Sequence, residues 1–285
     1  MNTPLITEAT SARCELAENP LWHPEERSVY WTDIPAGKIF RLDIISRKYE
    51  IIYRGEPVGG FTLQQNGDLL LFRVSDIALL SPDGRVSVLR RFSDKGMHRF
   101  NDVIADPEGR VFAGTMGDRL HGGLYRVDLD GTITKLFCGT DCSNGMGFSP
   151  DLKTFYWTCS TTRKILHFDY SRDSGAINRR RIFHRAKENE GIPDGLAVDA
   201  EGCIWSARWA GGSVVRHGLD GKVLDRIRFP AANITSLCFG GENLDQLFVT
   251  AAKNSDEESA LVSALFQTSI DLRGMNKFRS RIGSV

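Results

Sequence analysis

The chain repeats one pattern of hydrophobic and polar positions along its length. A short segment of alternating apolar residues leads into a turn rich in Pro, Asp, Glu and Gly, and a run of β-branched and aromatic residues follows the turn. Alternation with a period of two predicts β-strands, and turns of this composition predict connections between antiparallel strands. The run after the turn begins near six positions that lie 40 to 49 residues apart: Val29, Leu69, Val111, Phe155, Ile204 and Leu247.

A third apolar segment follows most copies, as at 38–43 and 123–131, and often ends in Asp-Gly, which favours tight hairpin turns. Three or four strands in each unit of about 40–50 residues are typical of a β-propeller blade. Six copies fill the chain, so the sequence predicts an all-β fold, a six-bladed β-propeller in which residues 1–285 form a single domain. The segment Leu5–Leu16 could supply the outer strand of the last blade. The charged stretch Lys253–Ser259 is expected to be a solvated loop.

The composition narrows the choice of partners. Hydrophobic residues make up 41% of the chain, and 36 Lys and Arg balance 36 Asp and Glu, so the formal net charge is zero. Binding to nucleic acid or to an anionic membrane normally needs a basic surplus. No apolar run reaches the roughly 20 residues of a membrane-spanning helix, and residues 1–19 lack the pattern of a signal peptide. We therefore expect a cytoplasmic protein that binds neither nucleic acid nor membrane, and, because a closed ring leaves no free sheet edge, a monomer.

The cysteines show no CxxC pair. In a chain of this length without a secretion signal, they are expected to be reduced and to serve mostly as small core residues. A disulfide bond between Cys138 and Cys142 is the alternative. The six cysteines are Cys14, Cys138, Cys142, Cys159, Cys203 and Cys238.

The repeat also aligns a set of polar residues. In a propeller the innermost strands line the central channel, so equivalent positions of different blades meet around one ring. Carboxylate and amide oxygens gathered in this way are suited to a hard divalent cation. The alternative is that each of these polar residues only satisfies backbone groups at the start of a strand. The equivalent first positions are Glu18, Gly59, Asn101, Asn144, Asp194 and Thr235.

Other catalytic motifs are missing from the sequence. It contains no G-x-S-x-G nucleophile elbow, no phosphate-binding loop and no H-E-x-x-H. Trp209 lies beyond the end of its predicted strand, unlike the other tryptophans, and could form the wall of a ligand pocket.

Several segments together resemble the family of senescence marker protein-30 (regucalcin), gluconolactonase and related sugar lactonases. They are AENPLW, RFNDVIADPEGRVFAGTM, SNGMGFSPDLKTFYW, IPDGLAVDAEGCIWSARWAGG and FGGENLDQLFVTAA, and they extend over nearly the whole chain. The resemblance implies a six-bladed propeller with one divalent metal ion at the channel mouth. Calcium is favoured, and Mg²⁺, Mn²⁺, Zn²⁺ or Fe²⁺ are possible. By the family pattern Glu18, Asn144 and Asp194 would bind the metal, Asn101 would lie beside it and touch substrate or metal-bound water, and Arg99 would hydrogen-bond sugar hydroxyls.

The resemblance also implies an activity, the metal-dependent hydrolysis of a sugar-acid lactone to the aldonic acid. Asp194 would act as general base and the metal as Lewis acid. The alternatives are a calcium-binding protein without hydrolase activity and a hydrolase of a non-sugar lactone or ester. In one place the chain departs from the family pattern. Animal members carry an acidic residue and a longer loop where Gly117-Asp118-Arg119 leads almost directly into the next strand, so the preferred sugar stays open.

Overall fold

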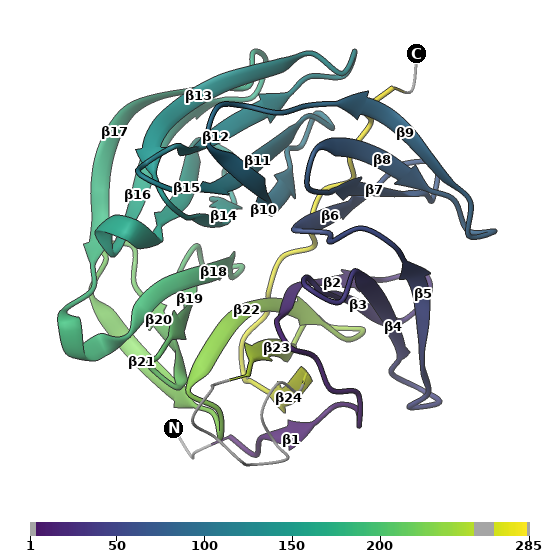
Figure 1. The fold of residues 1–285 in the computed structure, drawn as a ribbon. Coiled ribbons are helices and arrows are strands. Elements are labelled where there is room, and N and C mark those ends of the chain that lie inside the picture. Colours follow the sequence, from purple (N-terminus) through teal and green to yellow (C-terminus); the bar gives the residue numbers. More distant parts are fainter. Residues whose placement is uncertain (1–3, 254–264, 284–285) are drawn as a thin grey trace.

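The computed structural model describes residues 4–253 and 265–283 and consists almost entirely of β-strands. Within these residues, six four-stranded antiparallel sheets are arranged around a ring (Figure 1). The protein is therefore a six-bladed β-propeller, as the repeat predicted. The helical elements of the described part are two short 3₁₀ turns, η1 (Ser160–Thr162) and η2 (Glu188–Glu190), and neither could span a membrane.

Each blade uses consecutive strands, from the innermost to the outermost, except the last. The first blade is β2 (Ala17–His23), β3 (Ser28–Asp33), β4 (Lys38–Asp43) and β5 (Tyr49–Arg54). The second is β6 (Gly60–Leu63), β7 (Leu69–Phe72), β8 (Asp76–Leu80) and β9 (Val86–Arg91). The third is β10 (Met97–Ala105), β11 (Val111–Gly117), β12 (Gly122–Val127) and β13 (Ile133–Thr140). The fourth is β14 (Ser143–Phe148), β15 (Thr154–Cys159), β16 (Lys164–Ser171) and β17 (Ala176–Arg185). The fifth is β18 (Ile192–Val198), β19 (Ile204–Trp209), β20 (Ser213–His217) and β21 (Val223–Arg228). The sixth is β22 (Asn233–Gly240), β23 (Gln246–Ala252), β24 (Leu265–Ser269) and β1 (Thr7–Glu8).

The N-terminal segment closes the ring. Strand β1 pairs antiparallel with β24, and the amide of Ala9 donates a hydrogen bond of 2.8 Å to the carbonyl of Leu265. This confirms the prediction that the segment before the first repeat supplies the outer strand of the last blade. Apart from Lys253, which is exposed, the predicted loop Lys253–Ser259 lies outside the described residues.

Hydrophobic side chains hold neighbouring blades together. Six buried clusters each contain residues from two adjacent blades, so every seam of the ring has its own core. Between the third and fourth blades, for example, Phe112 and Phe155 pack with ring centroids 4.7 Å apart. Trp31 and Trp205 are fully buried in two other seams. Because each core lies between two neighbouring sheets, every sheet buries apolar side chains on both of its faces.

Two hairpin turns show why the Asp-x-x-Gly segments end the inner strands. The Oδ1 atom of Asp106 accepts the amide protons of Glu108 and Arg110, and Gly109 adopts a φ of 88°. Asp199 and Gly202 repeat this arrangement in the fifth blade, with a φ of 84° at the glycine. A side chain with a Cβ atom would be strained at that φ, so this turn needs glycine at its last position.

β-bulges aim the polar residues of the inner strands. In β10, β14 and β18 the pairing register shifts so that Asn101, Asn144 and Asp194 lie at the bulge, which bends the strand and redirects a side chain. In β2 the shift comes after Glu18, which pairs with β3, and Asn19, with a φ of 49°, takes the equivalent place. The predicted equivalence of Glu18 to the other site residues was therefore wrong by one residue.

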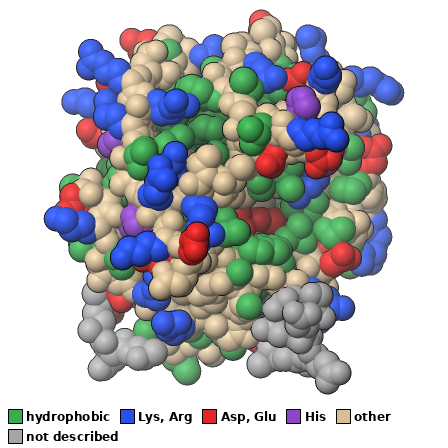
Figure 2. Space-filling model, turned by 60° about the vertical axis from the view of Figure 1, so that its left-hand side comes forward, with side chains coloured by type: hydrophobic (Ala, Val, Ile, Leu, Met, Phe, Trp, Pro, Cys, Tyr) green, Lys and Arg blue, Asp and Glu red, His purple; other side chains and the backbone are tan. Residues whose placement is uncertain are grey.

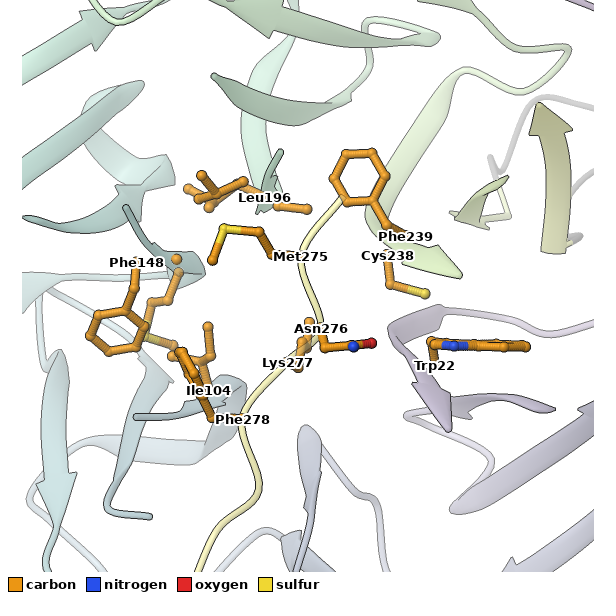
Figure 3. Close-up of a pocket in the computed structure, with 14 residues that line it drawn as sticks. Trp22, Ile104, Phe148, Leu196, Cys238, Phe239, Met275, Asn276, Lys277 and Phe278 are labelled. Carbon is orange, nitrogen blue, oxygen red and sulfur yellow. The ribbon is translucent and has the colours of Figure 1, made fainter. Parts of the chain in front are cut away.

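The C-terminal segment crosses the ring after β24, and Figure 1 shows it running past the inner strands toward the second blade. It bridges to Asp199 in the fifth blade and to Gln64 in the second. With the inner strands it encloses a cavity of about 50 Å³, shown in Figure 3, in which Lys277 is the one charged residue among those that line it. Burial raises the pKa of Asp102, and the positive charge of Lys277 opposes this rise. The C-terminal segment therefore contributes a positive charge near the acidic residues of the channel.

Candidate functional site

Three acidic side chains lie buried in the channel. Glu18, Asp102 and Asp194 are each less than a tenth exposed. Burial, with the charge of Asp102 as the next cause, raises the pKa of Glu18 to about 8. Burial, and then the charge of Glu18, raises the pKa of Asp194 well above its usual range. The protein therefore brings like charges together in a place where water cannot screen them, and a cation between them would relieve the repulsion.

Arg99 lies beside this acidic group. Its pKa is lowered by burial, while the charges of Cys142, Glu18 and Asp194 oppose that fall. Its Nη1 atom donates to the carbonyl of Phe100 at 3.0 Å and to Oδ1 of Asn101 at 2.5 Å. No hydrogen bond from its Nε or Nη2 is found within the described part of the chain. These two groups are thus available to a ligand.

The two asparagines are joined by hydrogen bonds. Nδ2 of Asn101 donates to Oδ1 of Asn144 at 2.6 Å and to the carbonyl of Ser143 at 2.9 Å. Nδ2 of Asn144 donates to Oγ of Ser160 at 2.9 Å and to Sγ of Cys142 at 3.2 Å. Both N–H groups of each amide are therefore used inside the protein. What either side chain can still offer to an ion or a ligand is its oxygen.

The donor set fits a hard divalent cation. Glu18, Asn144 and Asp194 offer two carboxylates and one amide oxygen, which are the ligands that Ca²⁺, Mg²⁺ and Mn²⁺ prefer. All three side chains are buried, so a cation held by them would be largely shielded from water. Two carboxylates also match the charge of a divalent ion.

A cavity of about 480 Å³ opens at the mouth of the channel. Arg99, Met116 and Trp209 line it, together with apolar residues such as Pro35 and Val74. Trp209 lines this cavity, as the prediction of a pocket wall required, but it is the last residue of β19 rather than a residue beyond the end of the strand. Figure 2 shows a hollow on the surface that hydrophobic side chains border and in which acidic side chains are visible.

The short loop after β11 lies at the same rim. Asp118 is 3.1 Å from His98, which lines the cavity. Arg119 and Leu120 have φ values of 52° and 62°, a conformation that is uncommon for residues other than glycine. The amide of Leu120 donates to Oδ1 of Asp141 at 2.5 Å, and this contact ties the loop to the connection between the third and fourth blades.

Three residues near the site were not predicted from the sequence to lie there. Asp102 follows Asn101 directly in the RFND segment, and its acidic character was a signal that could have been used. Cys142 and Ser160 carry no such signal, because they lie outside the repeated positions. Burial raises the pKa of Cys142 to about 12, so its thiol stays protonated.

The described residues also include the remaining cysteines and a second acidic cluster. No disulfide bond joins any two of the six cysteines, all of which lie in the described residues, so the alternative bond between Cys138 and Cys142 is not formed. Four of the six are buried. Asp199, Glu201 and Cys203 lie close enough together to resemble a metal site. The guanidinium of Arg216, however, bonds both carboxylates, with Nε 2.9 Å from Oδ2 of Asp199. One positive charge within the protein thus offsets part of the negative charge of this cluster.

Comparison with known proteins agrees with the fold. A family model described as the SMP-30/Gluconolactonase/LRE-like region matches residues 16–253. The chain belongs to this family. Among members of the SMP-30/gluconolactonase family, the pentonolactonase XacC of Haloferax volcanii is 39% identical over 287 residues, which cover 97% of this chain and 98% of that protein. Human regucalcin is 34% identical over 260 residues, or 87% of each chain.

Solved structures show the same propeller. A calcium-binding protein, regucalcin, from Agrobacterium tumefaciens superposes with a TM-score of 0.92 at 24% identity and 98% coverage of both chains. A gluconolactonase from Xanthomonas campestris gives a TM-score of 0.78 at 21% identity, with 94% of this chain and 89% of that chain covered. The fold and the family membership predicted from the sequence are thereby confirmed.

Proposed function

We propose that the protein is a metal-dependent lactonase that opens a sugar-acid lactone to the aldonic acid. The observation that carries this proposal is the burial of Glu18, Asn144 and Asp194 close to Arg99, which itself lines a cavity of about 480 Å³, a size suited to a small molecule. The names of two family members, a pentonolactonase and a gluconolactonase, support a sugar lactone as the substrate class.

Glu18, Asn144 and Asp194 would hold one divalent cation. Calcium suits these oxygen ligands, as do Mg²⁺ and Mn²⁺, and Zn²⁺ or Fe²⁺ also accept them. When bound, the cation would serve as a Lewis acid toward the carbonyl oxygen of the lactone. The remaining steps belong to the side chains around it.

Asp194 acts as the general base in this proposal. It takes a proton from a water molecule while the water oxygen bonds to the carbonyl carbon of the lactone. The bond between that carbon and the ring oxygen then breaks, and the ring oxygen takes up a proton, so that one water is added overall. Arg99 donates hydrogen bonds to sugar hydroxyls through the groups that the protein leaves open, and Asn101 offers its oxygen beside it. Trp209 covers the apolar face of the sugar ring.

A lactone screen tests the proposal. Protein treated with a chelator and then supplied with single divalent ions is mixed with aldonolactones and with a non-sugar lactone, and acid release is followed with a pH indicator. We expect no turnover without an ion and turnover of a sugar lactone once an ion is restored. Asp194→Ala should remove nearly all activity, whereas Leu219→Ala, on the exposed surface of the fifth blade, should retain it. Undiminished turnover after chelation, or a near wild-type rate in Asp194→Ala with metal bound, would contradict the mechanism.

The same screen separates the rival functions. The Agrobacterium structure is described as that of a calcium-binding protein, and tight ion binding without turnover of any lactone would favour that role. The remaining alternative is a hydrolase of a non-sugar lactone or ester. The apolar wall of the mouth, which includes Pro35, Pro57 and Val74, favours such a substrate, and this alternative would gain support if the non-sugar lactone were the best substrate.

A further inference from the structure

The hydroxyl group of Ser160 is shared between the fourth and fifth blades. Ser160 is the first residue of η1, directly after β15. Its Oγ atom accepts a hydrogen bond from Nδ2 of Asn144 at 2.9 Å and donates one to the carbonyl oxygen of Pro193 at 2.6 Å. Pro193 immediately precedes Asp194, so this single hydroxyl connects the amide of one site residue with the backbone beside another.

The hydrogen bonds that lead to Ser160 run in one direction only. Arg99 can only donate, and it donates to Oδ1 of Asn101, whose Nδ2 donates to Oδ1 of Asn144. At the other end the carbonyl of Pro193 can only accept. Each group between Arg99 and Pro193 is therefore fixed as a donor toward one neighbour and an acceptor toward the other. This fixes the orientation of the amides of both asparagines.

A flipped amide at Asn144 would break this order. Its Nδ2 would then face Nδ2 of Asn101, donor against donor. Its Oδ1 would face the Ser160 oxygen, whose one proton is already used by Pro193. Because the site is buried, unpaired donors and acceptors of this kind cost about 1–3 kcal/mol each. The chain thus keeps the oxygen of Asn144 on the side of Asn101.

We propose that Ser160 is a positioning residue that holds the amide oxygen of Asn144 in its metal-binding orientation and fixes it relative to the strand that carries Asp194. The inference rests on the proposed function, because it assumes that Asn144 and Asp194 bind the cation. Partners that orient metal ligands typically change metal affinity by about 10- to 100-fold when they are removed.

The test measures ion affinity rather than turnover. Chelator-treated full-length protein is titrated with Mn²⁺, and the free ion is followed by electron paramagnetic resonance. We expect Ser160→Ala to weaken Mn²⁺ binding by about 10- to 100-fold. Ser160→Thr keeps a hydroxyl group and should bind within a few-fold of wild type. The matched control is Thr162→Val in the same 3₁₀ turn, since among the described residues the Thr162 hydroxyl bonds only the carbonyl of Cys159, at 3.3 Å.

The outcomes separate the inference from the proposed function. Equal Mn²⁺ affinity of Ser160→Ala and wild type would overturn the positioning role. Loss of Mn²⁺ affinity in Thr162→Val as well would also overturn it, because the turn as a whole would then be responsible. If the wild-type protein itself binds no divalent ion, the proposed function fails instead. If Ser160→Ala does not fold, which thermal unfolding of the metal-free variant would reveal, Ser160→Cys carries the same test, because a thiol is close in size and a weak hydrogen-bonding group.

Discussion

Without a bound cation, the protein should lose stability as the pH rises. In the metal-free protein the pKa of Glu18 is raised from 4.5 to about 8, first by burial and then by the charge of Asp102. The folded protein then keeps a proton on Glu18 at pH values where the unfolded chain has released it. Stability rises with pH only where the unfolded state binds more protons. Here the folded state binds more, so stability is fully present below the unfolded pKa and is lost as the pH approaches about 8.

The size of the effect follows from the difference between the two pKa values. At about 1.4 kcal/mol per pH unit, the interval from 4.5 to about 8 corresponds to a loss of roughly 5 kcal/mol. Asp194 and Asp102, whose pKa values are also raised, act in the same direction, whereas the positive charges of Arg99 and Lys277 oppose the shift at Glu18. The structure therefore sets the direction and the order of magnitude.

Urea unfolding of chelator-treated protein at several pH values between about 5 and 8 measures this loss directly. An added divalent ion competes with the protons, so the stabilisation that it gives should grow over the same range. Glu18→Gln is the control, because it cannot titrate and it weakens the site. We expect this variant to lose less stability than the metal-free wild type as the pH rises, and to respond little to added ion. The buried His217 has a pKa lowered to about 3, chiefly by burial, and affects both proteins alike. The reasoning is refuted if the metal-free wild type is equally stable at both ends of the range, or if Glu18→Gln shows the same pH dependence.

Two further variants test the mouth and the closure of the ring. Trp209→Ala should raise KM for a sugar lactone by about fivefold with little change in kcat, since an aromatic wall contributes roughly 1 kcal/mol of ring contact. Steady-state kinetics measure this change, with Leu219→Ala as the control, because Leu219 is an exposed residue of the fifth blade. An unchanged KM in Trp209→Ala would exclude Trp209 from substrate binding. Deletion of residues 1–12 removes β1 and the buried Ala9, and should lower the free energy of unfolding by a few kcal/mol. Thermal unfolding measures this loss of stability. The control is Leu5→Ser, which should unfold like wild type because Leu5 is 81% exposed.

The blades and the closure of the ring could be predicted because every blade meets the same packing requirement. An inner strand must bury one face in each seam, so alternating residues such as Leu196 and Val198 recur in each copy. The segment before the first repeat was the one piece of the pattern without a blade, and the place beside β24 was the one outer strand position still to be filled. The unassigned N-terminal segment and the unfilled strand position together predict the pairing of β1 with β24.

The exact register of the site could not be predicted in the same way. A β-bulge adds one residue to a strand without changing which apolar residues are buried, so the sequence pattern of β2 does not reveal whether Glu18 or Asn19 occupies the bulge. Ser160 lies in a turn, where no period operates, and it meets Pro193 only because two blades pack side by side. Lys277 belongs to a segment outside the repeat, and it reaches the channel only because that segment crosses the ring.

The site depends on the whole ring, because its residues come from different blades. Glu18 stands on the first blade, Asn144 on the fourth and Asp194 on the fifth. No pair of neighbouring blades contains all three, so a cation held by them would join one side of the channel to the other. Closure by β1 and binding of the cation would then stabilise the same arrangement, one from the outer edge and one from the centre. A protein weakened at its outer closure should therefore depend more strongly on the ion for its stability, since each constraint limits the motions that the other leaves free.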